Sequence, residues 1–204
     1  MLFRSVNYKD SGRLNEAIPL LEEAYHASDK FPTLRWVGGP LLDAYTKAGR
    51  STAAAKLVPA FLADARKTLP KDSHQLEGAL AQYSLVLLQL KTYADAEPIL
   101  RECLAIREKT QPDLWSTFTA KSMLGDALLG QKKYDAAEPL LIAGYQGMKQ
   151  RETTIPTQGK FHVIRTLERL VALYEATDRP DEAARWRKEL EASKRAEKPP
   201  EKKP

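Results

Sequence analysis

The sequence has few of the residues that carry most enzyme chemistry. Its 204 residues include one cysteine and three histidines. The single cysteine, Cys103, excludes an internal disulfide and any Cys-x-x-Cys metal or redox site. His26, His74 and His162 show neither the His-x-x-x-His nor the His-Glu-x-x-His spacing of a helical metal site. We therefore expect no metal, no cofactor and no catalytic residues.

Long apolar runs and a strong charge imbalance are also missing. The longest apolar run has about four residues, Leu85 to Leu88, which is too short for a membrane span or for the apolar part of a secretory signal. Of the net charge of +5, +3 comes from the tail between Ser193 and Pro204. Because the rest of the chain is close to neutral, we expect no nucleic-acid partner for it. The composition predicts a soluble, cytoplasmic protein.

Residues 80 to 144 contain two copies of one pattern. The segments Leu80–Cys103 and Lys121–Gly144 each read as a helix, a tight turn and a second helix. An alanine after the turn and an apolar residue nine positions before it mark further copies along the chain. The marking pairs are Tyr8/Ala17, Tyr45/Ala54, Leu87/Ala96, Leu128/Ala137 and Tyr174/Ala183. The alanines are 37, 42, 41 and 46 residues apart, and such periods are typical of stacked helical arrays.

Turn residues and helix breakers divide the chain into five predicted units. Their bounds lie near residues 1–27, 34–67, 73–109, 113–150 and 159–192. Residues 193–204 form a Lys/Pro-rich basic tail that we expect to be disordered. The first helix of unit 1 is cut short, so we expect residues before Met1 or a partner that covers this end. Pro59 should kink or break its helix, and Gly144 and Gly147 indicate a closely packed neighbouring helix.

The motifs of units 3 and 4 resemble a known repeat. Residues 131–141 (Gln-Lys-Lys-Tyr-Asp-Ala-Ala-Glu-Pro-Leu-Leu) and 103–109 (Cys-Leu-Ala-Ile-Arg-Glu-Lys) are similar to the tetratricopeptide repeat (TPR), particularly to the longer form found in kinesin light chains. The resemblance covers about residues 5 to 192 and is strongest in units 3 and 4. It implies a right-handed α-solenoid of about five helix-turn-helix units.

The chain also resembles the repeat region that follows the kinase domain in some bacterial serine/threonine protein kinases. It contains no Gly-x-Gly-x-x-Gly, His-Arg-Asp or Asp-Phe-Gly motif of a kinase itself. This resemblance implies a fragment or a C-terminal regulatory region of a larger signalling protein. The alternative is a stand-alone TPR protein whose basic tail binds nucleic acid or an anionic surface electrostatically.

TPR arrays bind extended peptides or helices on the concave face, which is formed by the first helix of each hairpin. The resemblance therefore implies a non-catalytic scaffold for a protein or peptide partner, with ten polar residues on that face. They are Asp43, Lys47, Gln82, Gln89, Ser122, Asp126, Arg165, Glu168, Arg169 and Glu175. Arg165 and Arg169 are four residues apart on one helix, so both guanidinium groups can meet one carboxylate or phosphate. The other interpretation is a merely solvated helix face, and the oligomeric state stays open.

A few large or reactive side chains need a separate assignment. Trp36 and Trp115 lie off the repeat pattern and are candidates for exposed anchors. Cys103 occupies a repeat position that Ala24 and Gly144 fill in other units. A small residue there lets two helices approach, so we predict a packed thiol rather than a nucleophile.

Overall fold

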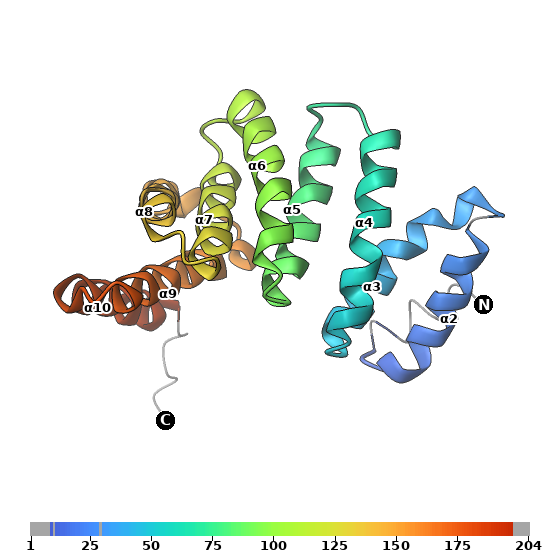
Figure 1. The fold of residues 1–204 in the computed structure, drawn as a ribbon, viewed down its shortest axis with the longest axis horizontal. Helices are drawn as coiled ribbons and strands as arrows, with labels where there is room; N and C mark the ends of the chain where they lie inside the picture. Colours follow the sequence, from blue (N-terminus) through green and yellow to red (C-terminus); the bar gives the residue numbers. More distant parts are fainter. Residues whose placement is uncertain (1–8, 10, 29, 198–204) are drawn as a thin grey trace. The chain divides into compact units, whose positions relative to one another are not determined.

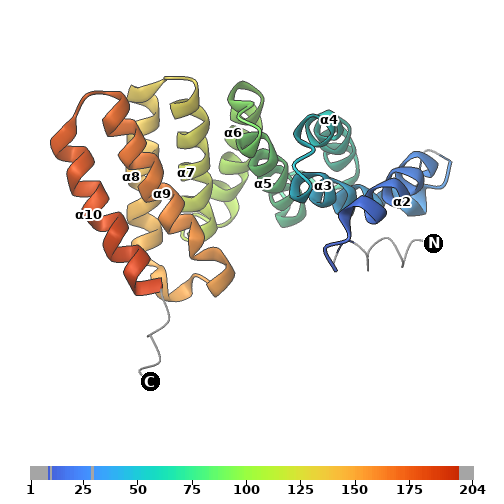
Figure 2. The ribbon, with the colours of Figure 1, turned by 90° about the horizontal axis from the view of Figure 1, so that it is seen from below.

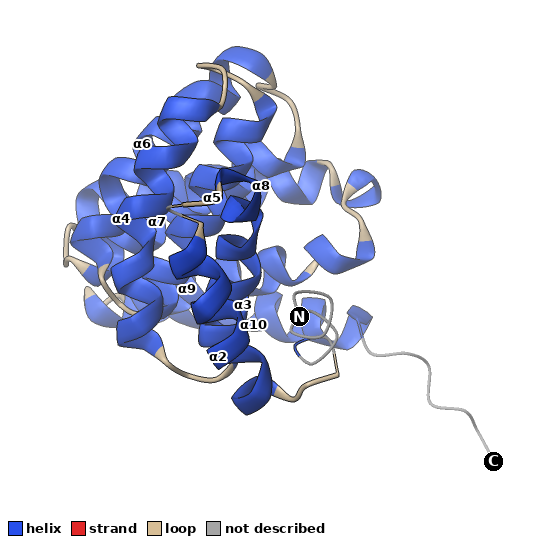
Figure 3. Cartoon of the chain, turned by 90° about the vertical axis from the view of Figure 1, so that its right-hand side faces the viewer, coloured by secondary structure: helices blue, strands red, loops and turns tan. Residues whose placement is uncertain are grey.

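The computed structural model describes residues 9, 11–28 and 30–197. These residues form α-helices joined by turns and short 3-10 segments, and none of them lies in a strand (Figure 3). The prediction of an all-α repeat fold is confirmed. The chain divides into two compact units, Met1–Leu69 and Pro70–Pro204. No helix in the described part of the chain is long and apolar enough to cross a membrane.

The first compact unit contains α2 (Leu14–Ala27), the 3-10 helix η1 (Pro32–Val37), α3 (Gly38–Lys47) and α4 (Ser51–Thr68). Helix α3 packs against both α2 and α4. The core of this compact unit is made of fully buried aliphatic side chains, among them Ile18, Leu21, Leu41 and Leu42. The short helix predicted before Gly12 falls largely on residues outside the described part.

Pro59 does not break its helix, so of the kink or break that we expected there, the break does not occur. Helix α4 runs continuously from Ser51 to Thr68 with Pro59 inside it. Pro59 lies on the exposed side of the helix, where the carbonyl that loses its intrahelical partner can bond to water. On the other side Val58, Phe61 and Leu62 are buried, and this packing keeps the helix together across the proline.

The second compact unit consists of three helical hairpins in chain order. They are α5 (His74–Gln89) with α6 (Tyr93–Thr110), α7 (Trp115–Gly130) with α8 (Tyr134–Gln150), and α9 (Phe161–Ala176) with α10 (Pro180–Glu197). Each helix packs against the next one, and α7 also contacts α5 and α9 (Figures 1 and 2). The first helices of the three hairpins therefore form one layer. Two 3-10 turns, η2 (Glu152–Thr154) and η3 (Thr157–Gly159), connect α8 to α9.

Helix α10 continues five residues beyond Ala192, where we expected the array to end. Residues 193–197 are therefore helical rather than part of a disordered tail. They continue the amphipathic helix, because Leu190 is buried and Ser193 and Lys194 are half-buried. The rest of the predicted tail, residues 198–204, lies outside the described residues.

The turns inside the hairpins confirm the repeat register. One residue in each turn adopts the left-handed conformation, and it always stands five positions before the marking alanine. These residues are Gly12, Gly49, Lys91, Lys132 and Asp178, with φ between 53° and 77°. Three residues separate the two helices of every described hairpin, at 48–50, 90–92, 131–133 and 177–179. A single turn geometry is thus used throughout, although only two of the five turns have the glycine that adopts it most easily.

The two glycines of α8 lie against α7, as predicted from the sequence. A Cβ atom on Gly144 would stand 2.9 Å from the carbonyl oxygen of Phe118 and 3.0 Å from the amide nitrogen of Ser122. A Cβ atom on Gly147 would come within 1.9 Å of the Phe118 ring. The backbones of α7 and α8 can approach this closely only because both positions lack a side chain.

Glutamates that follow the marking alanines join neighbouring hairpins. The carboxylate of Glu97 accepts hydrogen bonds at 2.8 Å from both Gln131 and Lys133, which lie in the turn of the next hairpin. The equivalent Glu138 accepts from the Tyr174 hydroxyl at 2.7 Å and from Arg179 at 2.8 Å. These charged hydrogen bonds link each hairpin to its successor.

The hydrogen bonds that Glu97 accepts from the next hairpin (the Glu97 joint) make the free energy of unfolding depend on pH in the acid range. Hydrogen bonds from Lys133 and Arg101 lower the pKa of Glu97 from 4.5 to about 2. A carboxyl whose pKa is depressed in the folded state stabilises the fold above its ordinary pKa, and this contribution disappears as the pH falls from about 4.5 to about 2. We expect Glu97→Gln to lower the free energy of unfolding by about 1 kcal/mol at neutral pH. Between about pH 4.5 and about pH 2 the stability of this variant should fall less steeply than that of the wild type.

Urea unfolding followed by circular dichroism at several pH values measures this effect. Glu108→Gln is the matched control, because the exposed Glu108 pairs with a single cation, Lys121, at 3.0 Å, and ion pairs near the surface contribute little. Equal pH profiles for Glu97→Gln and the wild type would refute the proposed role of the joint.

Candidate partner-binding site

The candidate site is a pocket of about 440 Å³ on the layer of first helices in the second compact unit. Helices α7 and α9 form most of it, and Tyr93 at the start of α6 closes one side. The lining residues are Tyr93, Asp126, Leu129, Gly130, Arg165, Glu168, Arg169 and Ala172. Four of the ten residues expected on the binding face therefore surround a single hollow.

Arg169 is fixed at this pocket by a hydrogen-bonded network. Its guanidinium forms an ion pair with Asp126 at 2.8 Å and donates to the Ser122 hydroxyl at 2.9 Å. Ser122 also shares a hydrogen bond of 2.7 Å with Thr166. Ser122 is fully buried and Arg169 is only 9% exposed, and this burial lowers the pKa of Arg169 against the opposing effect of Asp126. The network ties α7 to α9, and Ser122 reaches the pocket only through Arg169.

Arg165 is in a different situation from Arg169. It is half-buried, and its guanidinium carbon lies 5.2 Å from the centroid of the Phe161 ring. Among the described residues no carboxylate lies within ion-pair distance of it. The nearby carboxylate of Glu168 pairs instead with Lys194 at 3.1 Å. Arg165 therefore brings to the pocket a guanidinium that forms no ion pair with a carboxylate of the described residues.

The other residues expected on the binding face lie outside this pocket. Gln82 and Gln89 are exposed on α5, and Glu175 is exposed near the end of α9, where it pairs with Arg187. In the first compact unit, Asp43 forms ion pairs with Lys47 at 2.9 Å and with Lys9 at 3.1 Å. These residues belong to exposed or half-exposed helix faces but not to a described hollow.

Sequence reasoning missed the contribution of Tyr93. Tyr93 is not among the ten residues expected on the binding face, yet it is half-buried and lines the pocket. A Cβ atom on Gly130 would come within 2.3 Å of its ring, so the glycine lets the ring pack directly against the end of α7. The one available signal was the glycine at position 130, directly before the turn of the hairpin.

The candidate anchors and reactive groups are also placed by the structure. Trp36 is 52% exposed, whereas Trp115 is half-buried. Cys103 is buried and donates its S–H to the Glu77 carbonyl at 3.4 Å, and burial raises the pKa of the thiol to about 11. His162 stacks on Phe161, with ring centroids 4.0 Å apart, and burial lowers its pKa to about 4. No group of three or more His, Cys, Asp and Glu side chains that could hold a metal occurs in the described part of the chain.

Comparison with known proteins identifies the repeat. Residues 78–110 match the family model of the tetratricopeptide repeat, and they correspond to most of α5 and all of α6. No curated protein sequence matches the chain.

Several solved structures have a similar fold. TPR-like repeats of a kinesin light chain from Podosopora anserina give a TM-score of 0.73 at 19% identity, covering 93% of this chain and 90% of that one. BtubC (BKLC) from P. vanneervenii gives a TM-score of 0.71 at 15% identity, covering 97% and 80%. MamA from AMB-1 gives 0.64 at 20% identity, covering 96% and 98%. At these identities the similarity concerns the fold, and it confirms the expected TPR-like array of the kinesin-light-chain type.

Proposed function

We propose that this chain of TPR-like hairpins is a non-catalytic scaffold that holds a peptide or helix of a partner protein in the pocket between α7 and α9. The observation that supports this most directly is the difference between the two arginines of the pocket. Arg169 is buried and held by Asp126 and Ser122, so its role is to join α7 to α9 and to shape the pocket. Arg165 has no carboxylate partner among the described residues and is left to bind the ligand.

The chemistry of Arg165 indicates the group that it binds. A guanidinium forms paired, charge-assisted hydrogen bonds with planar or tetrahedral anions such as a carboxylate or a phosphate. Tyr93, Leu129 and Ala172 add apolar surface around it, which excludes water from such a contact. We therefore propose an acidic group of the partner as the anchor in this pocket. The exposed Gln82, Gln89 and Glu175 would extend the surface by hydrogen bonding to the partner backbone.

The wider context is also a proposal. We infer from the resemblance to the repeat regions of bacterial serine/threonine kinases that the scaffold serves a larger signalling protein as a fragment or C-terminal regulatory region. The coding sequence upstream of Met1 tests this directly, because a kinase domain in the same reading frame would support the proposal.

Selection from a displayed library of random dodecapeptides, with residues 1–204 as bait, tests the binding function. Each selected peptide is then labelled with fluorescein and titrated by fluorescence anisotropy. We expect Arg165→Ala to weaken binding about tenfold or more, because a hydrogen bond to a charged group contributes about 1.5–3 kcal/mol. The double variant Arg165→Ala/Arg169→Ala should abolish binding while circular dichroism shows that its helix content is retained.

Arg185→Ala is the matched control for this experiment. Arg185 is exposed on α10, and its guanidinium lies 5.8 Å from the Trp186 ring centroid, so it matches Arg165 in chemistry but lies outside the pocket. Wild-type affinity is expected for this variant. Selected peptides that bind equally well to Arg165→Ala would rule the pocket out as the binding site.

A further inference from the structure

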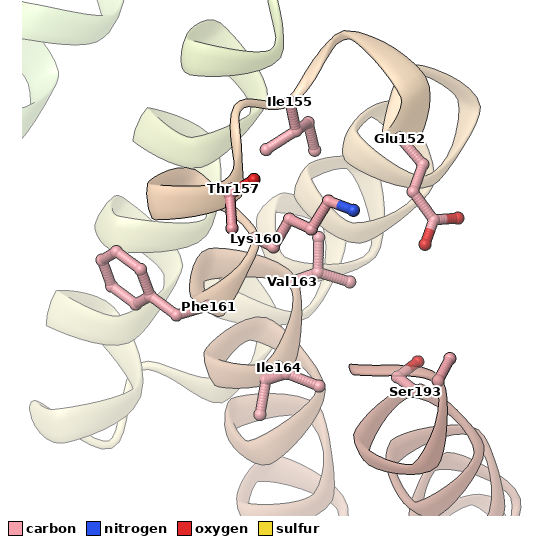
Figure 4. A pocket seen from close by; sticks show the side chains of 9 residues that line it. Glu152, Ile155, Thr157, Lys160, Phe161, Val163, Ile164 and Ser193 are labelled. Carbon is pink, nitrogen blue, oxygen red and sulfur yellow. The ribbon is translucent and has the colours of Figure 1, made fainter. Parts of the chain in front are cut away.

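A second hollow lies at the other end of α9 and is part of no binding face considered so far. It has a volume of about 340 Å³ and is enclosed by the start of α9, the segment between α8 and α9, and the end of α10 (Figure 4). Its lining residues are Glu152, Ile155, Thr157, Lys160, Phe161, Val163, Ile164, Ser193 and Ala196. Because α10 is the second helix of its hairpin, this cavity lies partly beyond the layer of first helices.

The cavity has an apolar wall, and both a cation and a carboxylate, Lys160 and Glu152, line it. Ile155 and Val163 are buried, and half-buried Ile164 faces the same space (Figure 4). The side chain of Lys160 extends toward the side of the cavity where Glu152 lies (Figure 4), and no carboxylate of the described residues lies within ion-pair distance of its ammonium. The carboxylate of Glu152 is already paired with Lys149 at 3.1 Å. The cavity is therefore suited to an apolar group that is close to a negative charge.

Both hollows lie along the same helix and are connected by two residues in contact. Phe161 lines the cavity and Arg165 lines the pocket, and the Arg165 guanidinium lies 5.2 Å from the centroid of the Phe161 ring. A segment bound at Arg165 and extending toward the start of α9 would therefore pass Phe161 and reach the cavity. Lys160 and Arg165, each without a carboxylate partner among the described residues, both lie along this track.

We propose that the cavity receives an apolar side chain of the same partner segment whose acidic group binds Arg165. This inference rests on the proposed function and specifies the partner as an extended segment that carries an acidic residue and an apolar residue at a fixed spacing. The α-helix rises about 1.5 Å per residue and an extended chain about 3.3 Å. The α9 residues that line the two hollows are on average roughly six positions apart, which corresponds to about two or three positions in an extended bound segment.

Peptide and protein variants together test this proposal. From the dodecapeptide selection, the tightest binder is prepared with each apolar residue changed to alanine, and all peptides are titrated against wild type, Ile164→Ser and Ile142→Ser. Ile142 is half-buried on α8 and belongs to neither hollow, so it controls for loss of stability, which thermal unfolding checks for both variants. We expect that one of these apolar residues lies two or three positions from an acidic residue of the peptide. Its change to alanine should lower the affinity for the wild-type protein fivefold or more.

The decisive result is the coupling between the two changes. Ile164→Ser should weaken binding of the parent peptide about as much as the alanine substitution in the peptide weakens binding to the wild-type protein. Combining the protein variant with the alanine peptide should cause little further loss of affinity. If the losses of affinity are additive, or if Ile164→Ser binds the parent peptide with full affinity, the inference is overturned. A loss of affinity with Arg165→Ala in the same experiment would still support the proposed function. If Arg165→Ala has no effect, or if the library yields no binder, both proposals fail. Binding of decanoate in the absence of peptide, lost in Ile164→Ser, would identify a small amphiphile as the occupant and would also overturn it.

Discussion

Replacing Arg107 with alanine should destabilise the second compact unit by about 3–5 kcal/mol, because it leaves a buried carboxylate without its main partner. Arg107 pairs with Glu77, and the two side chains are 9% and 1% exposed. Arg107 also donates to the Ser116 carbonyl at 2.7 Å. The pair therefore ties the start of α5 to the end of α6 and to the first turn of α7.

Urea unfolding of the single and double variants measures this effect. Arg101→Ala is the matched control, since Arg101 is 55% exposed and pairs with Glu97 at 2.8 Å, and we expect it to cost less than about 1 kcal/mol. The double variant Glu77→Leu/Arg107→Leu should recover much of the lost stability, because an apolar pair needs no compensation for buried charge. A small effect of Arg107→Ala, similar to that of Arg101→Ala, would contradict the assignment of a buried ion pair.

The same glycine-to-alanine change should have opposite effects at two helical positions of the second unit. Gly144→Ala should destabilise by about 1–3 kcal/mol, because the added Cβ meets the backbone of α7 at Phe118 and Ser122 and the helices must separate. Gly78→Ala in α5 should stabilise by up to about 1 kcal/mol, because nothing lies within 4 Å of the added Cβ and alanine is the better helix former.

Thermal and urea unfolding of the two variants compare these effects directly, and each variant serves as the control for the other. A stabilising Gly144→Ala would mean that α7 and α8 are not in close contact at this position. A destabilising Gly78→Ala would mean that α5 packs more tightly around Gly78 than the structure shows.

Much of the fold could be predicted because its elements are specified locally. Helices α2 (Leu14–Ala27) and α9 (Phe161–Ala176) lie within the predicted units 1–27 and 159–192, since turn residues stand on both sides of each. The break considered at Pro59 does not occur, because a proline on the exposed side of a well-packed helix costs less than one facing a neighbour. The extension of α10 to Glu197 was missed because composition alone says little about where an amphipathic helix frays.

The candidate site was predictable only in part. The repeat pattern indicates which helix face a residue occupies, and it placed Asp126, Arg165, Glu168 and Arg169 on one face, where they line one pocket. It does not show how side chains pair across two helices. The burial of Ser122 beneath Arg169, and the difference between Arg165 and Arg169, follow from contacts between residues more than forty positions apart. Whether these residues bind a partner stays a prediction.

The uniform three-residue turns have a consequence for how such a chain can change in length. The connections between hairpins vary from four residues at 111–114 to ten residues at 151–160, while those inside hairpins do not vary. Length differences are therefore taken up only where one hairpin passes to the next, at a small cost in loop-closure entropy. Each hairpin can thus be treated as a building block whose internal geometry is set, with the linking segments free to gain residues and, with them, new surface.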